Sequence, residues 1–228
     1  SYSSRKKRHY EIHSYIKPHL HGNKILEVGC ADGSLGQILL AEDRNRIYIG
    51  TDPLIPESAK PSDHFYLIRQ ELTILPVADD SMDCVLLIDM LHHASPEDQF
   101  KLISQVISKL KTNGRIIFFE YCYSTDKAAL NGSKSLDKFM SLSDSQKISC
   151  MSIIDWIGNS LIHRRDIPMP YSYKTVEEWE KFYSTFKLKL VQSQYLGFSK
   201  DFFHPGTYGL LILEKTNETL GSVNNTVE

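Results

Sequence analysis

The sequence predicts a three-layer, doubly wound α/β fold on a mostly parallel sheet of seven strands, with an antiparallel C-terminal hairpin strand. Short apolar runs alternate with segments in which apolar residues recur at helical spacing, which is typical of parallel sheets covered by helices on both faces. The first apolar run leads into a glycine-containing turn at residues 29–33. A length of 228 residues suits one such domain with a helical insertion after its fifth strand.

Composition and charge exclude several classes of protein. The hydrophobic content of 41% and charged content of 24% are typical of a globular domain. A net charge of −2 gives no overall basic field that would attract nucleic acid. The four cysteines are scattered without the spacing of a zinc site, which suits a reducing compartment. Without a signal peptide or an apolar run that could cross a bilayer, we expect a cytoplasmic protein with no membrane span and no nucleic-acid partner.

Residues 1–22 are expected to form an N-terminal helix. Ile12, Ile16 and Leu20 recur at four-residue spacing, which indicates a short amphipathic helix. The basic cluster at residues 5–9 is expected to be a solvated face of this helix. The alternative is that this cluster faces a bound ligand.

The predicted core begins with a strand at Lys24–Val28, a helix at 34–41 and a second strand at 46–50. Asp52 follows that second strand, about 20 residues past the glycine turn. An acid at this place is typical of sites that bind the ribose of a nucleoside. The prolines that follow predict a loop at 52–62 in place of a regular crossover helix.

Three further strands are predicted at Phe65–Arg69, 83–88 and 115–119. Residues 84–88 of the strand at 83–88 are continuously apolar, so we expect their side chains to be buried on both faces of the sheet. Apolar residues at helical spacing predict a helix at 101–110 between the last two of these strands.

The alternating pattern breaks at residues 124–186, which we interpret as a helical insertion that serves as a substrate lid. The run 148–162 is apolar enough for one helix. Thr175 and Glu178 have the spacing of a capping box, which predicts a second helix reaching about Phe186.

The final hairpin pairs residues 188–196 with Thr207–Glu214, so the predicted core comprises residues 23–123 and 187–216. The polar tail at 217–228 is expected to be disordered.

Two carboxylates, those of Glu27 and Asp32, crowd the turn at 29–33. They would repel the pyrophosphate of a dinucleotide but would suit a cationic cofactor. The run 27–36 resembles the loop E/D-x-G-x-G-x-G of the class I, Rossmann-like S-adenosylmethionine-dependent methyltransferases. The departure is Ala31, where many members have glycine.

A second stretch extends this resemblance. Residues 71–83 are similar to the family segment acid-x-x-x-L-P-[FV]-x-[DN]-x-S-F-D, with Glu71 as its leading acid. The chain most resembles the small-molecule, methyltransferase type 11-like branch, and the match covers about 24–120 well and 188–215 in outline. The resemblance implies S-adenosyl-L-methionine as cofactor, and it implies that the N-terminal helix at 1–22 is a lid over this cofactor. The implied cofactor contacts are Glu27, Gly29, Cys30, Ala31, Gly33, Asp52, Pro53, Glu71, Leu72, Asp89 and Met90.

Methyl transfer from a sulfonium is a displacement, and orientation of the acceptor can supply roughly 7–11 kcal/mol of the barrier reduction. A base is required only if the acceptor carries a proton at pH 7, as a hydroxyl does. The expected acceptor is a small molecule methylated on oxygen. The candidates for the base are His204, Glu120 and His93. The candidates for acceptor binding are Tyr15, His92, Tyr121, Tyr123, Trp156, Tyr171 and Tyr173.

No metal is expected from the sequence. Asp89 and Glu120 together could hold a divalent ion, as in catechol-type relatives of the resembling family. Octahedral Mg²⁺ requires more oxygen ligands than the sequence places there.

Two other functions stay open. The chain could methylate a macromolecule such as RNA or protein, using the basic residues at 5–9 and 164–165 for docking. The neutral charge balance and the absence of an Asn-Pro-Pro-Tyr arrangement argue against nucleic acid. The chain could also be a non-catalytic scaffold, but the intact glycine turn with its acids argues against that function.

Overall fold

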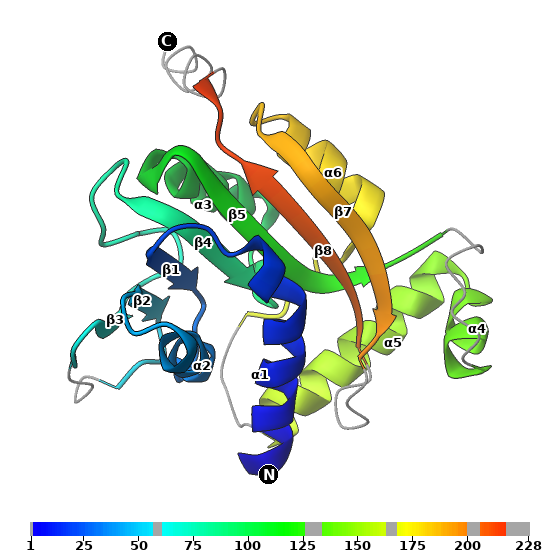
Figure 1. The fold of residues 1–228 in the computed structure, drawn as a ribbon. Helices are drawn as coiled ribbons and strands as arrows, with labels where there is room; N and C mark the ends of the chain where they lie inside the picture. The colour runs from blue at the N-terminus through cyan, green and yellow to red at the C-terminus, as the bar shows by residue number, and fades with distance from the viewer. Residues whose placement is uncertain (1, 57–60, 126–133, 163–167, 200–205, 218–228) are drawn as a thin grey trace.

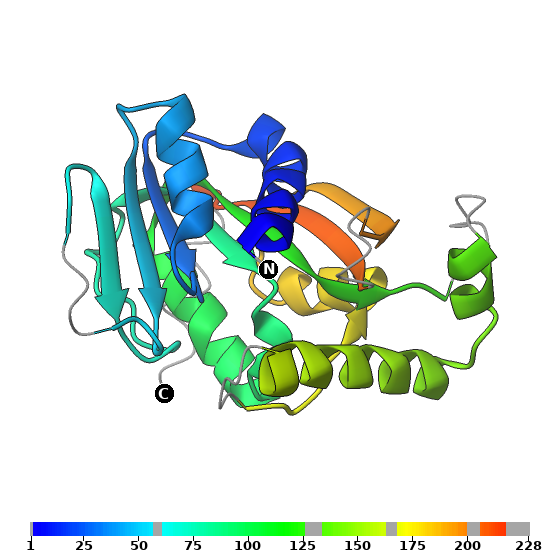
Figure 2. The ribbon, with the colours of Figure 1, turned by 90° about the horizontal axis from the view of Figure 1, so that it is seen from below.

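The computed structural model describes residues 2–56, 61–125, 134–162, 168–199 and 206–217. These residues form three layers around a central sheet. Helices α1 (Tyr2–Ile16) and α2 (Ser34–Glu42) cover one face of the sheet, and α3 (Pro96–Lys109) and α6 (Val176–Ser184) cover the other (Figures 1 and 2). The predicted three-layer α/β architecture is therefore confirmed.

The sheet has the strand order β3-β2-β1-β4-β5-β8-β7. The first five strands in this order are parallel, and β8 runs antiparallel to both β5 and β7. A short strand, β6, pairs with the end of β5 and was not predicted. The strands are β1 (Lys24–Val28), β2 (Ile47–Asp52), β3 (Phe65–Arg69), β4 (Met82–Ile88), β5 (Leu110–Tyr123), β6 (Lys174–Thr175), β7 (Lys189–Phe198) and β8 (Thr207–Glu214).

Strand β4 lies at the centre of the core. Cys84 and Leu86 pack in the cluster beneath α1 and α2, whereas Val85 and Leu87 pack beneath α3 and α6. Successive side chains of a strand point to opposite faces, so a strand covered on both faces must be apolar at every position. This requirement explains the continuous apolar run in the sequence.

Several core elements extend beyond their predicted bounds, and α3 and β5 differ most. Helix α3 begins at Pro96, where Ser95 Oγ accepts a hydrogen bond from the Asp98 amide, and not near residue 101. The apolar periodicity marks only the packed part of the helix, whereas the cap marks its start. Strand β5 is longer than the predicted 115–119 because β8 continues to pair with it as far as Tyr121.

The insertion contains more helices than predicted. Helix α4 (Lys134–Met140) was not expected, and α5 (Asp144–Trp156) begins four residues before the predicted start at 148. A capping box formed by Ser143 and Gln146 fixes that start. Residues Ile157–Ile162 continue α5 as a π-helix.

The capping box predicted at Thr175 and Glu178 is present. Thr175 Oγ1 accepts from the Glu178 amide (3.1 Å), and a Glu178 carboxylate oxygen accepts from the Thr175 amide (2.8 Å). Helix α6 therefore begins where the sequence indicated, and it ends at Ser184.

Some expectations fall outside the described residues. They concern His204, the basic residues 164–165 and the tail after Asn217. None of the helices in the described ranges combines the length and hydrophobicity needed to cross a membrane.

Candidate functional site

The glycine turn after β1 lies at the edge of the sheet where the parallel strands end. Gly29 (φ 74°), Ala31 (φ 50°) and Gly33 (φ 72°) all have left-handed backbone conformations, which glycine adopts most readily. A Cβ atom on Gly29 would lie 2.9 Å from the Met90 Cβ, so Met90 packs directly on the bare backbone. The amide of Gly33 donates to the carbonyl of the buried residue Cys30 (2.9 Å) and closes the turn.

Asp52 connects this turn to the end of β2. One carboxylate oxygen accepts from the Ala31 amide (2.9 Å), and the other accepts from the Leu54 amide (2.8 Å). Each carboxylate oxygen has a second lone pair. The carboxylate is thus fixed beside the turn with capacity to accept from two neighbouring hydroxyls.

Glu27 lies buried in the last part of β1 and accepts a hydrogen bond from the Tyr48 hydroxyl (2.5 Å). Burial raises the pKa of Glu27 to about 8, although the hydrogen bond from Tyr48 opposes this shift. The nearby carboxylates of Asp32 and Asp52 raise this pKa further. The Glu27 carboxyl is therefore largely protonated at neutral pH.

The segment after β3 lies beside Asp52, because the Gln70 amide donates to the Asp52 carbonyl (3.3 Å). This contact brings Glu71, which is exposed, and Leu72, which is half-buried, to the same edge as the glycine turn. The Pro53 carbonyl accepts from Arg69 Nε (3.1 Å) and thereby holds the loop after β2.

Asp89 follows β4 with a left-handed backbone (φ 53°), and its amide donates to the Phe119 carbonyl (2.7 Å). Its carboxylate forms an ion pair with the guanidinium of Arg8 on α1. Helix α1 therefore reaches over the end of β4. Within the described part of the chain, the second carboxylate oxygen of Asp89 is buried without a hydrogen-bond partner.

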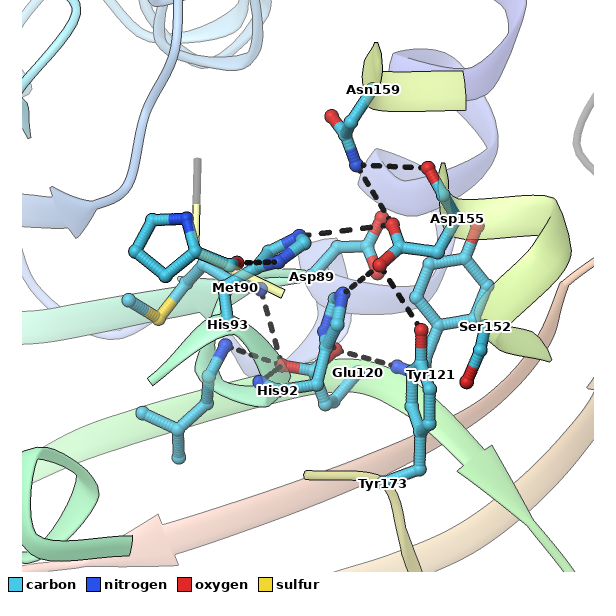
Figure 3. Close-up of polar contacts among 12 residues, drawn as sticks. Asp89, Met90, His92, His93, Glu120, Tyr121, Ser152, Asp155, Asn159 and Tyr173 are labelled. Carbon is cyan, nitrogen blue, oxygen red and sulfur yellow. Dashed lines mark hydrogen bonds and ion pairs between the residues drawn. The ribbon is translucent and has the colours of Figure 1, made fainter. Parts of the chain in front are cut away.

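A second group of polar side chains lies beside Asp89, where β4 and β5 meet the insertion (Figure 3). We call it the polar cluster. Its members are His92, His93, Glu120, Asp155 and Tyr173.

Glu120 is completely buried near the end of β5 and anchors the turn after β4. One of its oxygens accepts from the amides of Met90 (3.1 Å), Leu91 (2.6 Å) and His92 (3.3 Å). The other accepts from the Tyr121 amide (2.7 Å) and lies 2.5 Å from His92 Nδ1. Because a carboxylate only accepts hydrogen bonds, Nδ1 of His92 carries the proton.

Asp155 brings the insertion to this edge of the sheet. It lies on α5, and Lys147 on the same helix donates to the Ser124 carbonyl just after β5 (3.1 Å). The two oxygens of Asp155 accept from the Asn159 side-chain amide (2.7 Å) and the Tyr173 hydroxyl (3.0 Å).

The two histidines present their Nε2 atoms to Asp155 (Figure 3). Nε2 of His92 lies 3.6 Å from one Asp155 oxygen, and Nε2 of His93 lies 3.7 Å from the other. The Nδ1 atom of His93 donates to the Pro168 carbonyl (3.0 Å).

The charges around the two imidazoles differ. Burial lowers the pKa of His92, but the carboxylates of Glu120 and Asp155 on its two sides raise it to about 9. Burial and the neighbouring His92 lower the pKa of His93 to about 4. At neutral pH the cluster therefore contains one imidazolium and one neutral imidazole.

Several of the predicted acceptor-binding residues meet at the polar cluster. Tyr173 stacks on His92 (5.2 Å between ring centroids), and Tyr121 meets His92 edge-on (5.2 Å). Tyr171 stacks on Tyr173 (6.3 Å). Tyr123 is buried in the core cluster on the α1 side of the sheet.

The remaining predicted acceptor-binding residues are Tyr15 and Trp156. Tyr15 on α1 lines a small pocket with Phe119 and Tyr208. Trp156 follows Asp155 on α5 and is 44% exposed. His204, a predicted base, lies outside the described residues.

Asp155 and Asn159 were not among the predicted site residues. Asp155 is four residues after the buried Met151, so the two share one face of α5. A polar residue at helical spacing from a core residue was the available signal, and the exposed apolar residues nearby obscured it.

Comparison with known proteins identifies the type of domain in residues 25–114 and the fold of the chain. Residues 25–114 match the family model of a methyltransferase domain. No curated protein matches the chain. The structure is similar to Burkholderia thailandensis 1,6-didemethyltoxoflavin-N1-methyltransferase with bound 1,6-didemethyltoxoflavin and S-adenosylhomocysteine (TM-score 0.60, 12% identity, covering 94% of this chain and 79% of that one).

Two further similar structures span almost the same length. One is the YcgJ protein of Bacillus subtilis (TM-score 0.60, 16% identity, covering 92% of this chain and 99% of that one). The other is a Haloferax volcanii complex of the Trm112 methyltransferase activator with a methyltransferase (TM-score 0.61, 14% identity, covering 93% of this chain and 92% of that one). At these identities the likeness shows the fold.

The chain therefore contains a methyltransferase domain and has the fold of the class I, Rossmann-like S-adenosylmethionine-dependent methyltransferases, as the sequence resemblance implied. S-adenosylmethionine is the methyl donor of this class. The residues present fit it, because each oxygen of Asp52 retains a lone pair for a ribose hydroxyl beside the glycine turn.

Proposed function

We propose that the protein transfers the methyl group of S-adenosylmethionine to an oxygen atom of a small molecule that binds against the polar cluster. The observation that carries this proposal is the contact of Asp155, from the insertion, with His92 and His93 at the end of β4. This contact joins the proposed lid to the edge of the sheet that holds the glycine turn.

The donor half of the site is proposed to use the residues around the glycine turn. When bound, S-adenosylmethionine supplies an electrophilic methyl group. Asp52 would accept from the ribose hydroxyls, and the segment with Glu71 and Leu72 would meet the adenine. Met90, packed on Gly29, would set the depth of the pocket between the donor and acceptor halves.

The acceptor half is proposed to lie between α1 and the insertion. Arg8 closes over Asp89 from one side, and Asp155 and Tyr173 close over His92 from the other. Enclosing an acceptor orients it, and orientation can supply roughly 7–11 kcal/mol of the barrier reduction in such a displacement.

An acceptor hydroxyl must also lose a proton. Glu120 accepts from five donors, so we assign it a positioning role for His92 and the turn after β4. His93 has the more exposed ring of the two histidines, at 13% against 1%, and is the predicted base that faces the site. His204, the other predicted base, lies outside the described residues.

The alternative is a macromolecular acceptor; one similar structure is a complex with a methyltransferase activator, which is a protein partner and not an acceptor. Against it, another similar structure binds a small molecule.

We also propose a cytoplasmic location, which is supported by the free cysteines at positions 30, 84, 122 and 150.

The test measures formation of S-adenosylhomocysteine by mass spectrometry. The full chain is incubated with the methyl donor and either pooled small hydroxyl compounds or RNA and protein fractions. We expect turnover with the small-molecule pools and an oxygen-linked methyl group in the product. Turnover only with a macromolecular fraction, or methylation only at nitrogen, would overturn the proposal.

A further inference from the structure

We propose that His92, His93 and Asp155 bind a divalent transition-metal ion, best fitted by Zn²⁺. The His92 and His93 Nε2 atoms lie 3.6 and 3.7 Å from the Asp155 oxygens, and the two rings are 4.0 Å apart between centroids. Metal–ligand distances of about 2.0–2.2 Å place the ligands of a tetrahedral ion roughly 3.4 Å apart. The three side chains already approach this spacing.

The hydrogen bonds of the two histidines leave the correct atoms available for a metal. In each ring Nδ1 donates outward, to Glu120 from His92 and to the Pro168 carbonyl from His93. A metal-bound histidine nearly always donates its other ring N–H to a carboxylate or a backbone carbonyl. Nε2 of His92 is buried, and it has no hydrogen-bond partner among the described residues.

The third ligand is also held in place. Asn159 donates to one oxygen of Asp155 and Tyr173 donates to the other. A side-chain amide and a hydroxyl therefore orient the carboxylate, as outer-shell partners do for metal ligands. Every one of the three proposed ligands has such a support (Figure 3).

The buried charges also suit a cation. Glu120 and Asp155 are two carboxylates with almost no exposed surface, and they lie on opposite sides of His92. Buried carboxylates are tolerated where they are paired or coordinate a metal. A divalent ion between the Nε2 atoms and Asp155 would displace the Nε2 proton of the His92 imidazolium to solvent, and it would neutralise more of the carboxylate charge than that proton does.

A neighbouring combination of Asp89, His92 and Glu120 is less suitable. The Asp89 carboxylate already pairs with Arg8, and Glu120 is occupied by amide and imidazole donors. Two imidazoles and one carboxylate are also the softer donor set, which suits Zn²⁺ or Fe²⁺ better than Mg²⁺.

Three protein ligands leave one position of a tetrahedral ion open, as in catalytic zinc sites. If the proposed function is correct, an acceptor oxygen can occupy that position, and the metal lowers the pKa of its hydroxyl. This last step rests on the proposed function, whereas binding of the metal does not. In the metal-bound state His93 is a ligand and the ion replaces it as the activating group.

The test uses full-length protein from which metals have been removed with a chelator. Zn²⁺ is titrated by calorimetry, and Co²⁺ is followed by its visible absorption, which is intense for tetrahedral sites. We expect one equivalent to bind, with at least a tenfold loss of affinity in Asp155→Asn and His93→Gln. Glu120→Gln should weaken binding roughly 10–100-fold through loss of the support to His92.

Matched controls separate the site from general metal binding. Asp144→Asn changes an exposed carboxylate on the same helix, and His21→Gln changes an exposed histidine; both should bind Zn²⁺ like the wild type. Absence of saturable binding by the folded wild-type chain, or equal affinity in Asp155→Asn, would overturn the inference. Binding of S-adenosylmethionine is measured on the same samples, so failure of the metal site and failure of the proposed function are recorded separately.

Discussion

The buried carboxyl of Glu27 should make the stability of the protein depend strongly on pH. Its side chain is enclosed beneath the glycine turn with the Tyr48 hydroxyl 2.5 Å away. Burial raises its pKa from an ordinary value of 4.5 to about 8. Replacing Glu27 by Gln keeps an oxygen that can accept from Tyr48 and removes the ionisation.

The sign of the effect follows from linkage. A carboxyl with a raised pKa in the folded state contributes stability that is fully present below its unfolded pKa and is lost as the pH rises through the folded pKa. For Glu27 this window runs from about pH 4.5 to about pH 8. The difference in pKa corresponds to roughly 4–5 kcal/mol in the free energy of unfolding.

The assay is urea denaturation of the wild type and Glu27→Gln between pH 5 and pH 8.5. We expect the stability of the wild type, relative to Glu27→Gln, to fall by several kcal/mol across this range. Comparing the two proteins cancels the other titrating groups, including the histidines. Glu177→Gln, which changes an exposed glutamate, should follow the wild-type profile. Equal pH slopes for wild type and Glu27→Gln would refute the reasoning.

Two further predictions concern packing on the two faces of the sheet. A methyl group on Gly36 would lie 2.4 Å from the ring of Tyr48. The resulting overpacking in Gly36→Ala should lower the free energy of unfolding by about 1–3 kcal/mol, measured by thermal denaturation. An unchanged melting temperature would contradict this prediction. Trp179 is fully buried against Phe118, so Trp179→Ala should cost roughly 3–5 kcal/mol. The control is Trp156→Ala, at a site that is 44% exposed, and it should lower the free energy of unfolding by less than about 1 kcal/mol. Similar losses of stability in Trp179→Ala and Trp156→Ala would contradict the burial assigned to Trp179.

The sequence was most informative where structure is decided locally. Strand β1 and strand β3 have their predicted bounds, and the capping box of Thr175 and Glu178 begins α6 as expected. In each case the signal lies within a few residues of the element that it defines. The acid after β2 was also identified, because Asp52 sits at a fixed distance from the glycine turn in this type of βαβ unit.

The acceptor side was less predictable because it depends on contacts between distant segments. Asp155 meets His92 across more than sixty residues of sequence, and no local pattern encodes that contact. The apolar residues Trp156 and Ile157, which indicated a helix, are exposed, whereas the polar Asp155, four residues after the buried Met151, is buried. Glu120 was predicted as a base from its place after β5, but its role as an anchor depends on amide donors from the turn after β4.

Binding of S-adenosylmethionine tests the central claim most directly. Calorimetry measures this binding for three proteins: the wild type, Asp52→Asn and the exposed-site control Asp63→Asn. Both oxygens of Asp52 are held by backbone amides, and an asparagine side chain can satisfy only one of those amides. We expect one cofactor per wild-type and Asp63→Asn chain, and a loss of roughly 1.5–3 kcal/mol, about 10- to 100-fold in affinity, for Asp52→Asn. A wild-type chain that does not bind the cofactor, or an Asp52→Asn chain that binds it equally well, would contradict the account.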